Sequence, residues 1–257
     1  MLPHLLNYVR PIAGLLLESA VLALALRHGL FRRLPVFTSY LAAVVLVEII
    51  RWSVVSVSGF TSPQYRWAYW LTQASLMILR GLVVAEICRE VFGKHLGVWR
   101  MCRVFLASVA AILCAYAAVA AWRNQDHLRT LITTADRGLE LAILGTLVFA
   151  FLFARYYLIR IDRLVALIST GLVFYAAVQV VNSEFMFSWK SYFPSYSAIV
   201  VYSFAISMLI WLVAVWRPIP ARAPSAVLLG EQTYGEMMPE VNLRLRQLNN
   251  RLLEILR

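Results

Sequence analysis

Residues 35–57 read PVFTSYLAAVVLVEIIRWSVVSV, an apolar stretch that carries two charges near its middle, Glu48 and Arg51. About 20 apolar residues in a helix are enough to cross the hydrocarbon core of a bilayer. A charged side chain at that depth costs on the order of 2.5–3.5 kcal/mol on insertion scales, so it normally faces a partner or a polar interior. This stretch therefore predicts a transmembrane helix that belongs to a bundle with a polar core.

The rest of the chain repeats this pattern. Of its 257 residues 61% are hydrophobic and 14% charged, and the mean hydropathy is +0.73, which is far from the balance of a soluble protein. Further apolar stretches cover 11–29, 67–89, 102–122, 136–157, 163–184 and 196–216. We therefore predict an all-α fold, a polytopic integral membrane bundle of seven transmembrane helices. It divides into a transmembrane domain (1–217), a Pro-rich connector (218–238) and an amphipathic C-terminal helix (239–257).

The first apolar stretch has two interpretations. Pro11 suits the first position of a helix, because its missing N–H would be unpaired there in any case. The run Ala23-Leu24-Ala25 also resembles the small-residue end of a secretory signal peptide. Cleavage there would leave six helices and remove Glu18.

Basic residues predict the orientation, because Lys and Arg are enriched in cytoplasmic loops. One set of connections is rich in them: Arg27, Arg32, Arg33, Arg89, Lys94, Arg100, Arg103, Arg155, Arg160, Arg163, Arg217 and Arg222. The opposite connections hold fewer: Arg66, Lys190, and Arg123 and Arg129 beside Asp126. We therefore expect the N-terminus outside and the C-terminus in the cytoplasm, in a bacterial inner membrane. The net charge of +11 then faces the anionic lipids of the inner leaflet, and we expect no nucleic-acid partner.

Charged residues lie near the middle of several stretches: Glu18, Glu48, Arg51, Arg80 and Glu140. On antiparallel neighbours Glu48 and Arg80 come to a similar depth, and Glu140 comes to a depth that Arg51 can reach, so these groups are predicted to pair. Gln73 shares a stripe with Arg80. Two interpretations stay open: an ion-pair network that locks the helices together, or a proton relay, ligand counter-ion or ion path. Three acids face two bases, which leaves one carboxylate as a candidate for proton exchange.

The last two stretches carry uncharged polar groups. Tyr175, Gln179 and Asn182 share one helix face, and Ser203 and Ser207 share another. Such groups commonly form hydrogen bonds between helices, worth about 0.6 kcal/mol each on average. They could equally line the outer half of a polar cavity.

The residues that several cofactors and enzyme classes require are not found in the expected spans. The histidines lie near helix ends or in loops, which speaks against haem held by two spans, and the three cysteines have no paired spacing for an iron–sulfur or other metal site. The last stretch has no lysine for a retinal Schiff base, and no span has the pattern of an intramembrane protease. We therefore expect no haem, retinal or iron–sulfur cofactor, and no catalytic residue can be named.

The C-terminal segment has a heptad pattern. Pro239 begins a predicted helix in which apolar residues alternate four and three apart: Val241, Leu245, Leu248, Leu252 and Ile255. Two heptads are marginal as a free helix, so we expect the helix to lie on the anionic inner leaflet or to join a second copy or a separate protein.

Seven helices with an outside N-terminus and a helical cytoplasmic tail resemble the membrane sensory modules of bacterial signalling proteins. That resemblance implies a sensor whose output is on a separate partner, because no kinase or cyclase domain follows. We thus expect a non-enzymatic sensor-like module or accessory subunit. A small transporter or channel that uses the mid-membrane carboxylates is the alternative, and an intramembrane enzyme fits least.

Overall fold

The computed structural model describes residues 2–93, 96–123, 127–188, 193–216, 243, 246–251 and 254, with side chains from Ala13 onward in the first helix. These residues form helices joined by short turns, without a strand among them. The elements are α1 (Leu2–Arg27), the 3-10 turn η1 (Leu30–Arg32), α2 (Pro35–Ser58), α3 (Pro63–Phe92), α4 (Leu96–Trp122), α5 (His127–Tyr156), α6 (Arg163–Ser188) and α7 (Phe193–Val215).

Six helices are long and apolar enough to cross a bilayer, over Pro35–Ser58, Pro63–Phe92, Gly97–Trp122, Arg129–Tyr156, Arg163–Ser183 and Ala198–Val215. This indicates a helical, multi-pass membrane protein, as predicted. The span in α1 stays a prediction. Two expected boundaries are wrong: Pro11 lies inside α1 rather than at its start, and α5 begins nine residues before Asp136, at His127. Both helices extend into polar sequence that hydropathy alone does not assign to a helix.

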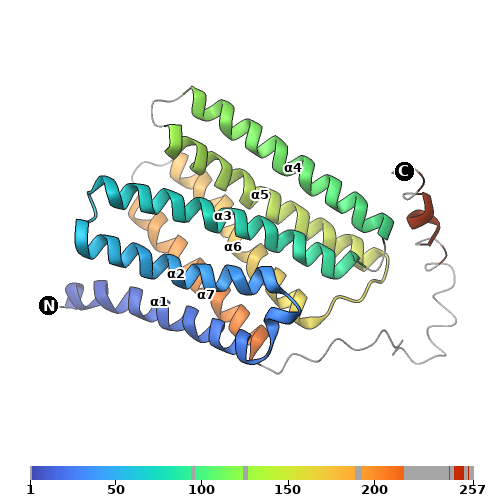
Figure 1. Cartoon of the computed structure of the whole chain (residues 1–257), viewed down its shortest axis with the longest axis horizontal. Helices are drawn as coiled ribbons and strands as arrows, with labels where there is room; N and C mark the ends of the chain where they lie inside the picture. Colours follow the sequence, from blue (N-terminus) through green and yellow to red (C-terminus); the bar gives the residue numbers. More distant parts are fainter. Residues whose placement is uncertain are drawn as a thin grey trace.

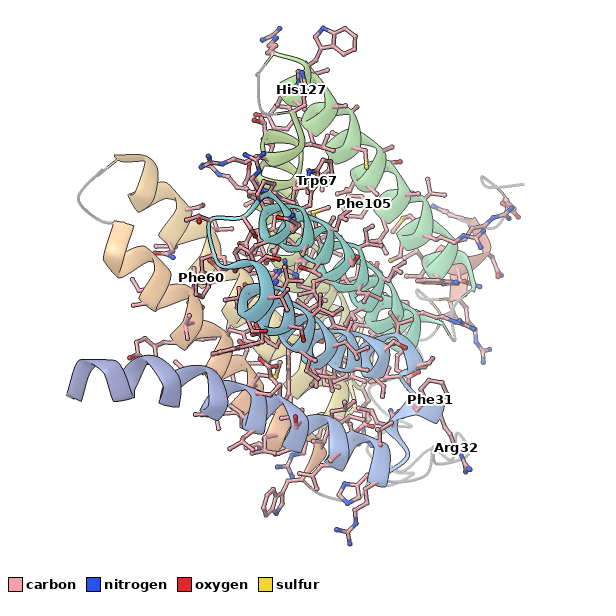
Figure 2. All side chains as sticks on the ribbon, turned by 60° about the vertical axis from the view of Figure 1, so that its left-hand side comes forward. Phe31, Arg32, Phe60, Trp67, Phe105 and His127 are labelled. Atoms are coloured by element: carbon pink, nitrogen blue, oxygen red, sulfur yellow. The ribbon has the colours of Figure 1, made fainter. Side chains whose placement is uncertain are left out.

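The helices form a ring in the order α1, α2, α3, α5, α6, α7, in which each helix packs on the next and α7 returns to α1. Helix α4 lies outside this ring, against α5 and α3 (Figure 1). The bundle has two ends, which we name by their turns. Figure 2 shows Phe31 and Arg32 at one, the η1 end, and Phe60 at the other, the Gly59 end.

Ion pairs and caps hold the η1 end together. The α2 N-terminus has no polar N-cap of its own, and the Glu86 carboxylate of α3 accepts the N–H groups of Val36 at 2.9 Å and Phe37 at 2.8 Å instead. A carboxylate there satisfies otherwise orphaned donors and suits the positive end of the helix dipole. Nearby, Arg33 pairs with Glu90 at 3.1 Å and with Asp162 at 2.6 Å. Helices α2 and α3 and the α5–α6 connection are therefore tied at one point.

The apolar core occupies the half of the bundle near the η1 end. Its fully buried members include Leu34, Phe37, Ile87, Leu147 and Ile168. Toward the Gly59 end the packing loosens: no side chain is buried over 48–58 of α2 or over 63–79 of α3. Helices α2 and α3 are thus densely packed in the η1 half and open in the Gly59 half, where the buried side chains come from other helices, among them Ile132 of α5 and Asn182 of α6.

The α6–α7 contact closes the packed half. Trp211 of α7 is buried, donates its indole N–H to the Ile168 carbonyl at 3.0 Å, and stacks edge-on against Phe37 with ring centroids 5.3 Å apart. Glycine is required at 171, because a Cβ there would overlap the Trp211 ring, 2.8 Å from its Cδ1. Close helix approach at small residues is typical of membrane bundles.

Part of the tail lies beside α4. Residues 246–251 are helical, and the Asn249 side-chain oxygen accepts the Gly97 N–H at 2.6 Å. Of the predicted seam only Leu248 is among the described residues. Val241, Leu245, Leu252 and Ile255 lie outside them, as does the connector 218–238, so the partner role of the seam stays a prediction.

Candidate functional site: a buried charge network

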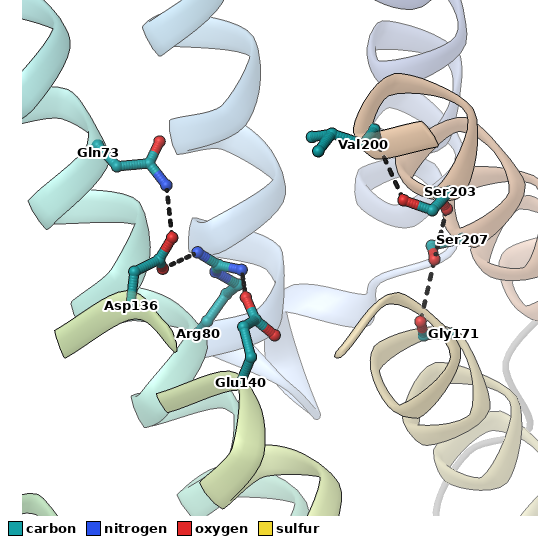
Figure 3. Close-up of polar contacts among 8 residues, drawn as sticks. All are labelled: Gln73, Arg80, Asp136, Glu140, Gly171, Val200, Ser203 and Ser207. Atoms are coloured by element: carbon teal, nitrogen blue, oxygen red, sulfur yellow. Dashed lines mark hydrogen bonds and ion pairs between the residues drawn. The ribbon is translucent and has the colours of Figure 1, made fainter. Parts of the chain in front are cut away.

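Arg80 is the centre of the polar core. The residue is 3% exposed. Its guanidinium bridges two carboxylates of α5: Nη2 donates to Asp136 at 2.7 Å, and Nη1 donates to Glu140. Asp136 and Glu140 are four residues apart, one helical turn, so both reach the same cation. Figure 3 shows the guanidinium between the two carboxylates. The arginine thus joins α3 to α5 in the middle of the bundle.

A second arginine extends the network to α2. Arg51 donates to the Thr72 hydroxyl at 3.0 Å and to the Gln73 carbonyl oxygen at 3.2 Å, and its guanidinium lies over the Tyr69 ring, 4.6 Å from the centroid. Gln73 in turn donates to Asp136 at 3.2 Å. One hydrogen-bonded chain therefore runs from α2 through α3 to α5.

Two predicted pairings are replaced by this arrangement. Arg80 pairs with Asp136 and Glu140 rather than with Glu48, and Glu140 pairs with Arg80 rather than with Arg51. The physical reason is the length of α5: because it starts at His127, Asp136 lies nine residues, about two and a half turns, inside the helix and competes for Arg80. In the described part of the chain no ion pair includes Glu48.

Glu18 lies on the inward stripe of α1, together with Val21 and Ala25. It is 7% exposed, and its Oε2 atom has no hydrogen-bond partner among the described residues. Glu48, half-buried on the adjacent helix α2, repels it electrostatically. In the described part of the chain, neither of these two carboxylates forms an ion pair with an arginine.

The uncharged predicted residues separate into two groups. Tyr175 joins the network, since the Arg80 guanidinium lies 5.5 Å from its ring centroid, whereas Gln179 is half-buried and Asn182 buried toward the Gly59 end of α6. Ser207 donates to the Gly171 carbonyl at 3.0 Å, and Ser203 donates to Val200 of its own helix at 2.9 Å (Figure 3). Ser207 therefore contributes to helix packing, and Ser203 does not contact the charge network.

Three network residues were not singled out from the sequence. Asp136 stands at the start of the predicted stretch 136–157, and Thr72 and Tyr69 carry no charge that would draw attention to them within 67–89. Their signal was spacing: Asp136 and Glu140 share a face of α5, and Tyr69, Thr72 and Gln73 lie on adjacent turns of α3. That pattern identifies a polar face, but only the packing of the helices shows which arginine each face meets.

Counting Asp136, the buried and half-buried ionisable groups at this level are four acids (Glu18, Glu48, Asp136, Glu140) and two bases (Arg51, Arg80). If all were ionised, the core would hold two negative charges in excess. Arg137, beside Asp136, carries a further positive charge on α5, but its side chain is exposed. A net charge in a low-dielectric interior is costly, so this arrangement can bind protons or cations.

We compared the chain with protein-family models, curated proteins and solved structures, and found no match in any of the three.

Proposed function

We propose that the protein is a non-enzymatic membrane sensor module or accessory subunit. In this proposal its polar core receives a stimulus from the Gly59 end, and its η1 end passes the response to a separate partner. With the orientation that the basic residues predict, the Gly59 end faces outside and the η1 end faces the cytoplasm.

One observation carries this proposal: the charge network lies at the boundary between the open and the packed half of the bundle. Gln73, Arg51 and Glu48 are half-buried on the open side. On the other side Phe37, Trp211 and their neighbours fill the interior with apolar side chains. In this proposal a stimulus reaches the charges from the Gly59 end. An ion on its way to the other end would meet only a few uncharged polar groups, such as Thr38 and Ser169, among the apolar side chains.

Helix α3 supplies a path for the response. It carries Gln73 and Arg80 in the network and Glu86 and Glu90 at the η1 end, where they cap α2 and hold Arg33. Arg80 and Glu86 are six residues apart, about 9 Å along the helix axis. A shift or rotation of α3 that rearranges the network would therefore also disturb the contacts at the η1 end.

The alternative is a small transporter or channel that uses the mid-membrane carboxylates. The unpaired Glu18 oxygen favours it, because intramembrane carboxylates occur along ion and proton paths. The packed apolar half argues against it.

Flux measurements separate the two functions. We expect proteoliposomes that contain the wild-type chain to show no proton, sodium or potassium flux above that of empty liposomes, under either sign of membrane potential. A flux that Glu18→Gln or Glu48→Gln abolishes, and that the tail variant Glu254→Gln leaves intact, would overturn the sensor proposal in favour of transport.

A further inference from the structure

The two excess negative charges of the core are not spread evenly. Arg80 is shared by Asp136 and Glu140, and Arg51 is held by Thr72, Gln73 and Tyr69. Neither arginine makes an ion pair with Glu18 or Glu48 in the part of the chain that the structure describes. Among the described residues Glu18 and Glu48 therefore lack an ion-pair partner, although Arg51 lies one turn from Glu48 on α2.

Glu18 supplies a buried acceptor on α1, which packs against α2. It follows the same inward stripe as Val21 and Ala25, both 0% exposed, and its own Oε2 lacks a partner. Glu48 lies one turn beyond the buried Val44 on the facing helix. An unpartnered buried carboxylate loses its hydration without recovering a hydrogen bond, and a second carboxylate opposite it adds repulsion. Both costs disappear when a positive charge lies between the two groups.

We propose that Glu18 and Glu48 together bind one monovalent cation, which is a proton, a small alkali-metal ion or a primary ammonium group. This inference rests on the proposed sensor function and names the stimulus: the monovalent cation that binds at this site.

The surroundings of the pair favour a single charge. No third Asp, Glu, His or Cys joins the pair to form a metal-ligand cluster in the described residues, and structural zinc sites need four ligands. Helix α2 also carries the buried Tyr40, which interacts electrostatically with Glu18, Arg80 and Glu140. Helix α7, the other neighbour of α1, presents no charged group over 198–215, where its one tyrosine, Tyr202, is exposed.

Thermal unfolding of the full chain in nanodiscs tests the site, because a ligand that binds the folded state raises its stability. The unfolding midpoint is measured against sodium, potassium and methylammonium, with choline as the replacement ion at constant ionic strength, and separately against pH. Above the dissociation constant the midpoint should rise by about 3–6 °C for each tenfold increase in the bound cation. A metal or ammonium site responds to that ion at fixed pH, whereas a proton site responds only to falling pH.

Variants assign the response to the pair. Glu18→Gln should raise the midpoint in choline and lose the cation or pH dependence, and Glu48→Gln should lose it as well, which keeps the test decisive if one variant does not fold. Glu254→Gln, an exposed acid of the tail, should keep the full response. A wild-type midpoint that is flat in every cation and in pH would overturn the site, as would equal responses to sodium and choline with a flat pH profile.

A response that survives in both glutamine variants would overturn it too. The sensor role and the cation site fail separately: ion flux refutes the first, and an unresponsive midpoint refutes the second.

Discussion

Arg80 should be the most costly single residue to remove from the polar core. Arg80→Met leaves two carboxylates, the buried Glu140 and the half-buried Asp136, without their shared cation. Breaking one buried ion pair by removing a partner costs about 3–5 kcal/mol, so Arg80→Met should cost at least that much. For a chain of this size the loss corresponds to a fall in the unfolding midpoint of about 6–20 °C. Glu140→Gln should cost less, because Asp136 still pairs with the arginine.

A double-mutant cycle in detergent, followed by the fluorescence of the eight tryptophans, measures the coupling. The double variant Arg80→Met/Glu140→Gln should be more stable than the sum of the single losses predicts, by about 0.5–3 kcal/mol. The matched control cycle combines Arg80→Met with Glu48→Gln. Glu48 makes no ion pair with Arg80 in this structure, so the two losses should add within about 0.5 kcal/mol. Strong coupling of Arg80 to Glu48, with an additive cycle for Glu140, would refute the arrangement.

Two further changes test the packing and the tail. Gly171→Ala should lower stability by about 1–3 kcal/mol, because the new methyl group overlaps a buried indole, whereas Gly145→Ala, with open space around it, should be neutral in the same melting assay. The double change Leu245→Glu/Leu252→Glu removes the predicted apolar seam and should leave the melting midpoint unchanged. It should lower the oligomeric mass measured by light scattering, or the amount of a partner recovered from native membranes. Leu243→Glu, off the seam, should change neither, and an unaltered mass and recovery in the double variant would remove the support for association.

The sequence predicts the helices well, because an apolar stretch of span length has few alternatives in a membrane. The helix α2 was predicted over 35–57 and is found over Pro35–Ser58. The first nine residues of α5 are not part of the predicted span, because 127–135 reads HLRTLITTA, a mixed sequence that is less apolar than the stretch after it. Its helical conformation is held by packing on α3 and α4, which a single sequence does not reveal.

The charge network could be predicted in part of its membership but not in its pairing, since Asp136 was not among the expected residues. Glu18, Arg51, Arg80 and Glu140 are identified by depth alone. Which carboxylate meets which arginine depends on the rotation of each helix and on the order of helices in the ring, where α3 contacts α5 although α4 lies between them in the chain. Depth arguments place neighbours along the chain together, and that assumption produced the expected Glu48–Arg80 pair.

Labelling from each side of the membrane tests the central claim, that the polar core is accessible from the Gly59 end and sealed at the η1 end. Gln179→Cys is placed in a background with Cys88, Cys102 and Cys114 changed to alanine, with Leu172→Cys as the matched site two turns deeper on the same face of α6. A membrane-impermeant maleimide should modify Gln179→Cys from the side of the Gly59 end only, and should modify the buried Leu172→Cys from neither side. Modification of either site from the side of the η1 end would contradict the account.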